Sequence, residues 1–491
     1  MNFRSTPRAF SFALCALLMS AAAFATTPVI TVSSPANHAA TTSPVNYVAA
    51  ATSPDCAKGI SAIRVYSAPG VSAYTVAGGK LNSYINLLKG TYNTVVQAWD
   101  NCGGVAKAEV TVTVTGETMP AGFLYTVNSD YFSGDTANYV QGFTIVPNGA
   151  LALTSQGPVK ANVAPESVAS DKGGYRLYVG DYVSGDVFPY FINRANGYLT
   201  PVPGAPFPVG RSVSAVAVHP SGKLIFATRD EQSAGDGVTV FELQSDGSLK
   251  PAPGSPYATQ PGPQALVVDP SGKYLYVADQ SDYLDAFEIN QTSGMLTPLP
   301  GSPFKLRVPS NCRSGSALPV DIIDTAGKYL YTADRFIDSI SGFSIGGNGT
   351  PAEMTGSPWP DNAGCNVPVN CTSCIGNPSS LAVDGTGKYL YGGNLGTMDI
   401  SIYSIGANGA LTYVKDTSQY SACGGPIRTD ATGNYLYAPS CGAGVPNGYS
   451  GLVGFSINHT TGDLTPLPTS PYNYPGPTSS NPGLQGFTVT P

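Results

Sequence analysis

The chain has 491 residues, a formal net charge of −7 and only 11% charged residues. Nucleic-acid-binding proteins carry basic surfaces, so this acidic balance excludes that class. The 42% hydrophobic residues, in regular alternation with polar ones, exclude a disordered chain, and three histidines exclude a histidine-rich metal site. The 57 glycines and 42 prolines fall between apolar runs, which indicates an all-β protein with tight turns.

Residues 1–25 are predicted to be a signal peptide. Two arginines precede an apolar stretch at 9–22 that is too short to span a bilayer comfortably. Ala23-Phe24-Ala25 has the small-x-small form of a cleavage site. We therefore expect a secreted or periplasmic protein with no membrane span, whose net charge becomes −9 once the two arginines are removed.

Residues 26–117 are predicted to form a β-sandwich. Short runs such as 29–32 and 94–99 alternate apolar and polar residues and are separated by glycine and proline. Cys56 and Cys102 both follow predicted strands, and we expect them to form a disulfide between two loops at one end. The segment resembles bacterial immunoglobulin-like modules, notably in Lys89-Gly90-Thr91-Tyr92, and this resemblance implies a spacer or docking role.

Residues 121–491 contain seven copies of a repeat of about 50 residues. The clearest copy reads Pro-Ser-Gly-Lys-Tyr-Leu-Tyr-Val-Ala-Asp at 270–279 and ends in a proline-rich edge at 294–303. Each copy has room for four strands, which predicts a seven-bladed β-propeller. One aromatic residue recurs in every copy, at spacings of 46 to 60 residues: Tyr125, Tyr178, Phe226, Tyr276, Tyr331, Tyr391 and Tyr437.

The ends of this segment predict how the ring closes. The first copy begins at its second strand, near Phe123, and has no inner strand before it. The chain ends in Gly486-Phe487-Thr488-Val489-Thr490, which matches the inner strands of other copies. We therefore expect the C-terminal strand to complete the first blade.

The repeats resemble the lactonase-type seven-bladed propellers, which include 6-phosphogluconolactonase-like and YVTN-repeat proteins. The residues that carry this resemblance are the 270–279 unit and the Gly-x-Leu-x-Pro-x-Pro-Gly-Ser-Pro edges at 247–256 and 294–303. The resemblance implies hydrolysis of a lactone or cyclic ester at the channel mouth. Members often carry histidine in loops where this chain has Pro165-Glu166, Pro263-Gln264 and Pro378-Ser379.

Polar residues that flank the inner and second strands are the candidates for this site. Opening a lactone needs a base to activate water and donors for the oxyanion. We expect Glu166 as the base, with Arg211 and Arg428 as the arginine partners. Further binding candidates are Asp181, Asp230, Gln264, Asp279, Arg313, Asp334 and Asn394.

No metal site or cofactor is predicted, because no loop has a dense run of aspartates; a Ca²⁺ ion is a weaker alternative. Cys423 and Cys441 flank one hairpin and are expected to pair. Disulfides are also expected among Cys312, Cys365, Cys371 and Cys374, with partners left open, although Cys371-x-x-Cys374 alone would also suit redox chemistry or half a zinc site. The alternative function is a non-catalytic extracellular scaffold, a monomer that binds a small molecule, a glycan or a protein.

Overall fold

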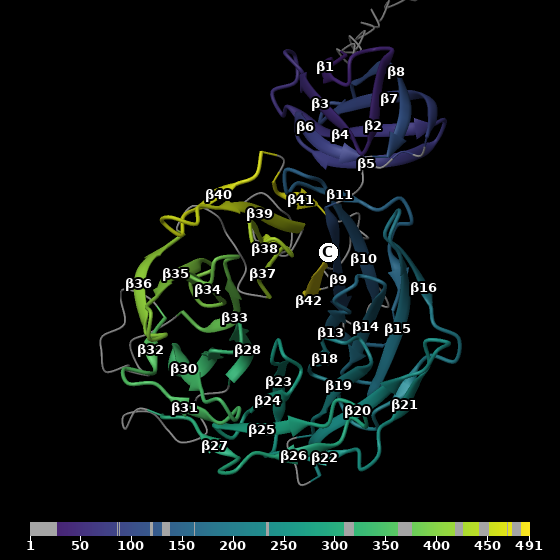
Figure 1. Ribbon diagram of the computed structural model, residues 1–491. Coiled ribbons are helices and arrows are strands. Elements are labelled where there is room, and N and C mark those ends of the chain that lie inside the picture. Colours follow the sequence, from purple (N-terminus) through teal and green to yellow (C-terminus); the bar gives the residue numbers. More distant parts are fainter. Residues whose placement is uncertain are drawn as a thin grey trace, which may run out of the picture.

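The computed structural model describes residues 27–85, 87, 89–117, 121–129, 138–161, 163–231, 235–308, 319–361, 376–417, 426–440, 451–468, 470–473 and 483–491. Figure 1 shows a small two-sheet body beside a ring of sheets. The predicted signal peptide lies outside these residues. Among them, no helix is long and apolar enough to cross a membrane.

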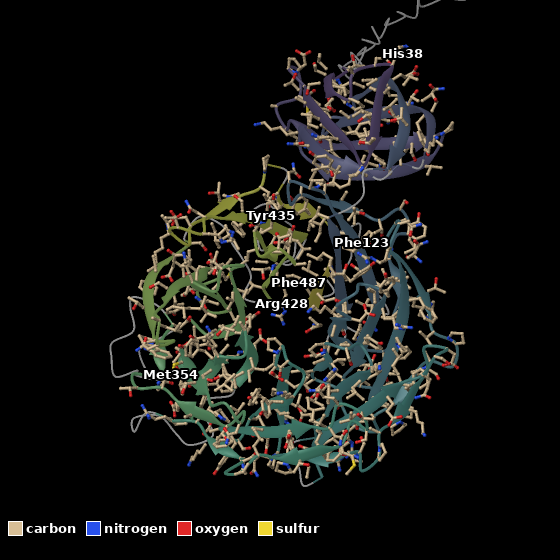
Figure 2. All side chains as sticks on the ribbon, viewed as in Figure 1. His38, Phe123, Met354, Arg428, Tyr435 and Phe487 are labelled. Carbon is tan, nitrogen blue, oxygen red and sulfur yellow. A yellow bond between two sulfur atoms is a disulfide. The ribbon has the colours of Figure 1, made fainter. Side chains whose placement is uncertain are left out.

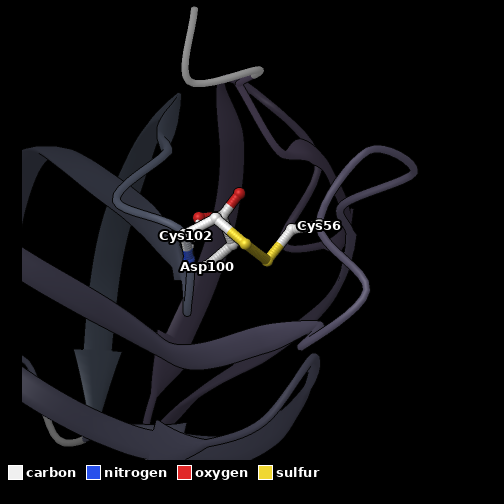
Figure 3. A group of neighbouring side chains, drawn as sticks. All are labelled: Cys56, Asp100 and Cys102. Atoms are coloured by element: carbon white, nitrogen blue, oxygen red, sulfur yellow. Dashed lines mark hydrogen bonds between the residues drawn. A yellow bond between two sulfur atoms is a disulfide. The ribbon is translucent and has the colours of Figure 1, made fainter. Parts of the chain in front are cut away.

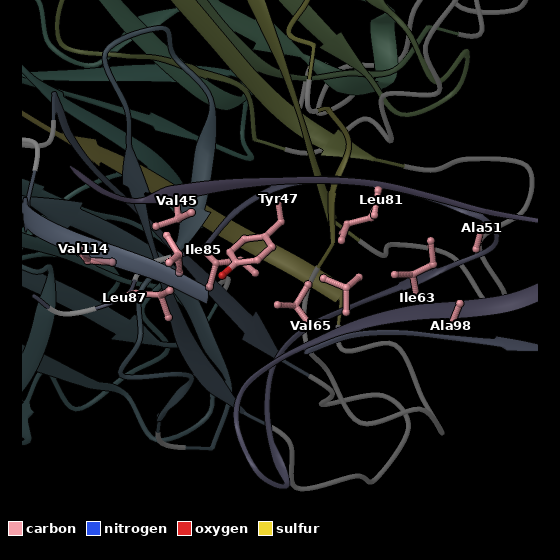
Figure 4. Packing of buried hydrophobic residues seen from close by; sticks show 13 residues of the cluster. Val45, Tyr47, Ala51, Ile63, Val65, Leu81, Ile85, Leu87, Ala98 and Val114 are labelled. Carbon is pink, nitrogen blue, oxygen red and sulfur yellow. The ribbon is translucent and has the colours of Figure 1, made fainter. Parts of the chain in front are cut away.

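The small body is a sandwich of two sheets, as the alternation in its sequence predicts. Alternate side chains of each strand point inward, and buried residues such as Tyr47, Ile63 and Val65 form its core (Figure 4). One sheet has the order β1 (Val29–Ser34), β3 (Val45–Thr52), β6 (Lys80–Ile85). The other has the order β2 (Ala39–Ser43), β8 (Val105–Glu117), β7 (Gly90–Asp100), β4 (Ile60–Ala68), β5 (Val71–Ala77).

The predicted disulfide of the sandwich is confirmed. Cys56 and Cys102 are bonded, with Cα atoms 5.9 Å apart, and link the β3–β4 and β7–β8 connections (Figure 3). Asp100 beside them accepts hydrogen bonds from the backbone N–H of Cys102 at 2.9 Å and of Gly104 at 2.7 Å. The two sulfurs and this carboxylate lie close together, but the disulfide leaves no thiolate to bind a metal.

The ring consists of seven antiparallel sheets, which confirms the predicted all-β propeller. The clearest repeat forms the four strands expected of each copy, with a short fifth strand that the sequence did not reveal. From inner to outer strand, the first blade is β42 (Gly483–Thr490), β9 (Gly122–Ser129), β10 (Tyr139–Ile145) and β11 (Leu151–Leu153) with β12 (Val159–Lys160), and the second is β13 (Pro165–Ser170), β14 (Arg176–Asp181), β15 (Asp186–Asn193) and β16 (Tyr198–Pro201) with β17 (Phe207–Pro208). The third blade is β18 (Val216–Val218), β19 (Leu224–Arg229), β20 (Gly237–Leu243) and β21 (Leu249–Pro251) with β22 (Tyr257–Ala258). The fourth blade is β23 (Pro263–Val268), β24 (Tyr274–Asp279), β25 (Tyr283–Ile289) and β26 (Leu296–Pro298) with β27 (Phe304–Lys305).

The last three blades follow the same plan. A 3₁₀ turn, η1 (Arg335–Ile337), joins the second and third strands of the fifth blade. The strands are β28 (Pro319–Thr325), β29 (Tyr329–Asp334), β30 (Ser339–Ile345), β31 (Pro351–Glu353) with β32 (Trp359–Pro360); β33 (Pro378–Val383), β34 (Tyr389–Asn394), β35 (Ile400–Ile405), β36 (Leu411–Asp416); and β37 (Arg428–Thr429), β38 (Tyr435–Ser440), β39 (Gly451–Ile457), β40 (Leu464–Pro466) with β41 (Tyr472–Asn473).

The C-terminal strand closes the ring as predicted. Strand β42 pairs antiparallel with β9, from Gly483 opposite Ser129 to Thr490 opposite Phe123. All eight residues of β9 are buried, so this strand lies inside the sheet and needs a neighbour on each side. The first blade is thus built from both ends of the propeller segment.

The recurring tyrosine joins neighbouring blades through its hydroxyl. Tyr331 donates to the carbonyl oxygen of Gly409 at 2.6 Å, and this glycine lies in a turn of the next blade. At Gly409 a Cβ atom would lie only 2.5 Å from the ring of Tyr329, so the turn must be glycine. The same bond recurs for four other tyrosines and glycines: Tyr125 to Gly197, Tyr276 to Gly349, Tyr391 to Gly462 and Tyr437 to Gly149.

Removing one of these hydroxyls should destabilise the ring, and the chain offers a matched control. Tyr331→Phe leaves the buried Gly409 carbonyl without its donor, which costs about 1–3 kcal/mol of unfolding free energy. The equivalent Tyr178 is also fully buried, but its hydroxyl has no hydrogen-bond partner among the described residues. Tyr178→Phe should therefore change stability little or raise it. Equal losses in urea denaturation of the two variants would contradict this account.

The sandwich and the propeller share a sheet. Strand β6 pairs parallel with β11, the outer strand of the first blade, with Tyr84 opposite Ala152 and Ile85 opposite Leu153. Tyr84 also packs against the hydrophobic core of that blade. The sheet order is therefore β1-β3-β6-β11-β10-β9-β42, so the sandwich is attached through its backbone as well as through the linker.

Candidate functional site

A cavity of about 360 Å³ lies on the axis of the propeller and is lined by all seven inner strands or the residues leading into them. Figure 2 shows Arg428 at the edge of this central opening. The polar residues that line it are Glu166, Ser167, Ser214, Gln264, Asp321, Arg335, Ser379, Ser380, Arg428 and Gln485.

A repeated β-bulge supplies several of these side chains. In the second blade Pro165 pairs with Asp181 and Ser167 with Gly180, so Glu166 is the extra residue of the bulge. The pairing shifts in the same way at Gln264, Ser379 and Gln485. A bulge re-aims a side chain, and proline suits the first position of a strand, where its missing N–H breaks no pairing. The Pro-x pairs in the sequence therefore marked the residues that reach the cavity.

Glu166 lines the cavity with a carboxyl group whose pKa is raised. Burial raises the pKa of Glu166 above its usual value, and the nearby carboxylate of Asp181 raises it further. Both effects disfavour the charged form, because the carboxyl group is partly desolvated and a second negative charge is close. A carboxylate with this environment is a stronger base once ionised than one in water.

The two arginines of the cavity differ in their partners. The Nη1 atom of Arg428 donates to Asp321 Oδ2 at 3.0 Å and to Ser380 Oγ at 3.1 Å, which links three blades across the cavity wall. The buried Nε atom of Arg335 has no hydrogen-bond partner within the described ranges. Among the described residues no carboxylate forms an ion pair with Arg335, whereas much of the charge of Arg428 is balanced by Asp321.

Arg335 was considered with Asp334 among the polar residues after the second strands, but only Asp334 was chosen as a predicted site residue. Arg335 lies in the 3₁₀ turn η1 after the second strand of its blade, directly after Asp334. The signal was its place in the repeat, where the third blade has Arg229-Asp230 in a similar position. The sequence does not reveal which of these arginines has carboxylate partners.

Gln264 is brought to the cavity as predicted and is held by a neighbouring blade. Its Nε2 atom donates to Asp230 Oδ2 at 2.6 Å, and Ser214 Oγ donates to the same oxygen at 3.2 Å. Asp230 itself is almost wholly buried. Asp230 therefore orients the side chain of Gln264, which faces the cavity.

Comparisons with known proteins agree with this architecture. Residues 196–312 match a family model described as "Lactonase, 7-bladed beta-propeller". A putative 6-phosphogluconolactonase from Bacteroides fragilis superposes with a TM-score of 0.58 at 19% identity, over 76% of this chain and 99% of that one. The periplasmic gluconolactonase of Pseudomonas aeruginosa superposes with a TM-score of 0.57 at 15% identity, over 75% and 99%. The fold is that of a lactonase-type propeller. A search of curated proteins finds no match.

Arg211 does not line the cavity of this lactonase-type propeller, contrary to the prediction. Its Nη1 atom forms ion pairs with Glu231 Oε2 at 2.7 Å and Asp236 Oδ1 at 3.4 Å. These partners lie between β19 and β20, so they hold the guanidinium against the third blade itself. The sequence showed Arg211 ahead of an inner strand but gave no sign of the two carboxylates.

The residues at the ends of the second strands are also placed differently from the prediction. Asp181, Asp279, Asp334 and Asn394 are fully buried, and none of them lines the cavity. Asp181, for example, accepts hydrogen bonds from three backbone N–H groups, those of Ala164, Val183 and Ser184. Buried carboxylates of this kind satisfy the loop backbone, so the recurrence of Asp in the repeat reflects folding.

Several predictions fall outside the described residues. These are Arg313 and the six propeller cysteines: Cys312, Cys365, Cys371, Cys374, Cys423 and Cys441. His219 is described and lies in a turn, where its Nε2 atom is 2.8 Å from the carbonyl oxygen of Gly272 in the next blade. This histidine does not line the cavity and is buried at a contact between blades.

Proposed function

We propose that the protein hydrolyses a lactone or a related cyclic ester in the central cavity, with Glu166 as the general base. The observation that carries this proposal is the placement of Glu166 on a cavity-facing bulge, in an environment that raises its pKa. The lactonase-type fold and the two superposed lactonases support the same reaction class.

In the proposed reaction, ionised Glu166 takes a proton from a water molecule. The oxygen of that water bonds at the same time to the carbonyl carbon of the lactone. The carbonyl π electrons move to oxygen, and the positive charges of Arg335 and Arg428, which both line the cavity, stabilise that oxyanion. The intermediate then expels the ring oxygen, which takes the proton back from Glu166. The products are a hydroxy acid and regenerated Glu166, with no cofactor required.

Replacing the base should abolish most of the turnover. Glu166→Gln keeps the size of the side chain but cannot accept the proton, so kcat should fall by roughly 10²–10⁴-fold. The measurement is acid release by the purified protein over a panel of sugar and aliphatic lactones. Glu288→Gln, an exposed glutamate on β25, is the matched control and should keep full activity. Because Glu166 must be ionised, kcat/KM of the wild type should rise with pH through the raised pKa of Glu166.

Each outcome of this assay has a distinct meaning. Turnover that survives in Glu166→Gln would keep the hydrolase and reject Glu166 as its base. Loss of turnover in Glu288→Gln as well would point to a folding defect. No turnover on any lactone would reject the proposed reaction.

The second candidate function is ligand or partner binding without catalysis. One observation favours it: Val163, Val183, Phe336 and Met398 are large apolar side chains that are 44–54% exposed. All four precede an inner strand or follow a second strand, so they belong to the propeller face where Glu166 lies. Exposed apolar groups around an opening are typical of binding surfaces. Saturable binding of glycans or peptides by a protein without lactone turnover would support this function.

We also infer that the protein works outside the cytoplasm. The Cys56–Cys102 disulfide supports this location, because disulfides persist in oxidising compartments. Fractionation of the producing cell, with detection of a protein that begins near residue 26, tests it.

A further inference from the structure

A cluster of acidic side chains lies at the junction of the fifth and sixth blades, away from the central cavity. Asp361 follows β32, Asn394 ends β34, and Asp416 ends β36. The negative charges of Asp338, Asp399 and Asp416 all act on Asp361. Asp361 and Asn394 are fully buried, so these groups cannot be solvated by bulk water.

The hydroxyl of Ser401 on β35 lies at the centre of this cluster. It receives a hydrogen bond from Asn394 Nδ2 at 2.7 Å and lies 2.7 Å from the carbonyl oxygen of Asp361. It is also 3.4 Å from Asp361 Oδ1 and interacts with Asp416. Because a hydroxyl has one proton, Ser401 can fully satisfy only one of these acceptors.

The other donors of the cluster are already engaged. Asn394 uses Nδ2 to donate to Asp399 Oδ1 at 2.8 Å as well as to Ser401. Thr397 donates its hydroxyl to the same Asp399 oxygen at 2.7 Å. Tyr403 donates to the backbone carbonyls of 360–361. The cluster therefore has more acceptor oxygens than protons to share among them.

Three buried oxygens are left without a hydrogen-bond partner among the described residues: Asp361 Oδ2, Asn394 Oδ1 and Asp416 Oδ1. The carboxylate of Asp361 and the amide of Asn394 lie on the same side of Gly392, since a Cβ atom there would lie 3.8 Å from Oδ1 of each residue. Unsatisfied buried acceptors destabilise the folded state, and repulsion between the carboxylates adds to this.

One proton does not satisfy the three oxygens, and a second would have to come from Asp416, whose pKa burial also raises. Burial and the neighbouring carboxylates raise the pKa of Asp361 well above its usual value, which favours its protonated form. One proton on Asp361 Oδ2 could be donated to one of the other two oxygens. That arrangement still leaves the third oxygen buried and unsatisfied.

We propose that this junction binds a divalent cation, Ca²⁺, through the carboxylates of Asp361 and Asp416 and the amide oxygen of Asn394. Ca²⁺ prefers oxygen ligands, tolerates irregular geometry and accepts amide oxygens beside carboxylates. Apart from Cys56, Asp100 and Cys102, no three acidic, thiol or imidazole ligand atoms in the described ranges lie within 4.8 Å of one another. The site therefore depends on the Asn394 oxygen, and the ion joins two blades.

The test is thermal unfolding of the full protein after treatment with EDTA, with and without millimolar CaCl₂, beside calorimetric titration with CaCl₂ alone. We expect saturable binding and a midpoint that rises by several degrees with Ca²⁺. Asp361→Asn and, at a half-buried position, Asp416→Asn should each lose the Ca²⁺-dependent shift. Their EDTA midpoints should equal or exceed that of the wild type, because a repelling charge is removed.

Asp285→Asn is the control. It alters a buried acidic pair in the fourth blade, where Asp285 interacts with Asp279, and should keep the Ca²⁺-dependent shift. Absence of any Ca²⁺-dependent shift in the wild type would overturn the proposal in favour of protonation. Loss of the shift in Asp285→Asn with retention in Asp361→Asn would overturn the assigned location.

Discussion

Deleting residues 483–491 should abolish the cooperative folding of the propeller. These residues form β42, whose side chains Leu484 and Phe487 are buried. Burial of two such side chains contributes about 1.5–3 kcal/mol each, and each lost backbone hydrogen bond adds about 0.5–1.5 kcal/mol. Together these losses approach the whole stability of a typical domain, about 5–15 kcal/mol. The deletion would also leave the buried strand β9 as an open edge.

Thermal unfolding followed by circular dichroism measures this effect. Deletion of Pro491 alone is the control, because this residue is exposed and lies beyond the last strand. Adding a synthetic peptide of residues 483–491 to the truncated protein should restore part of the transition, since the groove beside β9 is specific for this strand. A truncated protein that keeps the wild-type midpoint would show that the ring does not need closure.

Stability should fall as the pH rises from 5 to 9, because of carboxyl groups buried in the blades. Burial raises the pKa of Asp334 to about 8, and burial together with Asp285 raises that of Asp279 to about 9. In the unfolded chain both groups ionise near pH 3.8. Between pH 3.8 and pH 8–9 the folded state therefore binds more protons than the unfolded chain. As the pH rises through this range, each group lowers the unfolding free energy by up to about 1.4 kcal/mol per pH unit. Their contribution is complete below pH 3.8 and is lost through pH 8–9.

Urea denaturation at a series of pH values, with Asp334→Asn beside the wild type, checks this dependence. Asparagine keeps the size of the side chain and its contacts with Thr332 and Ser341 but does not ionise. The variant should therefore show a shallower decline and exceed the wild type in stability at pH 8. A wild-type stability that increases between pH 5 and 8, or identical slopes in the two proteins, would contradict the assignment.

The propeller was predictable because its signals are local and repeated. The Gly-Lys-Tyr-Leu-Tyr unit specifies a turn, a strand and an inter-blade hydroxyl bond within five residues, as at Tyr331. The matching C-terminal strand predicted closure for the same reason. Gly-Ser-Pro at the blade edges also has a local role, since the Ser302 hydroxyl accepts the backbone N–H of Ala286.

The site was predicted less well because its chemistry depends on contacts between blades. Arg211 and Arg335 both looked like loop arginines, and only the fold shows that the first is paired with Asp236 and the second is not hydrogen-bonded at Nε. Asp334 is likewise fully buried, which its position in the repeat did not reveal. The pairing of β6 with β11 could not be predicted from the sequence either, because a three-residue outer strand has no sequence pattern that identifies its partner.

The pairing of β6 with β11 determines how the molecule would respond to a mechanical force applied to the N-terminal sandwich. Strands β1 and β42, the first and last strands described, belong to one continuous sheet, so tension on the sandwich passes toward the strand that closes the ring (Figure 1). The β6–β11 junction has two paired positions, whereas β42 and β9 pair at seven. Under load the pairing of β6 with β11 should therefore break first. The sandwich would then separate from the first blade while the ring stays closed.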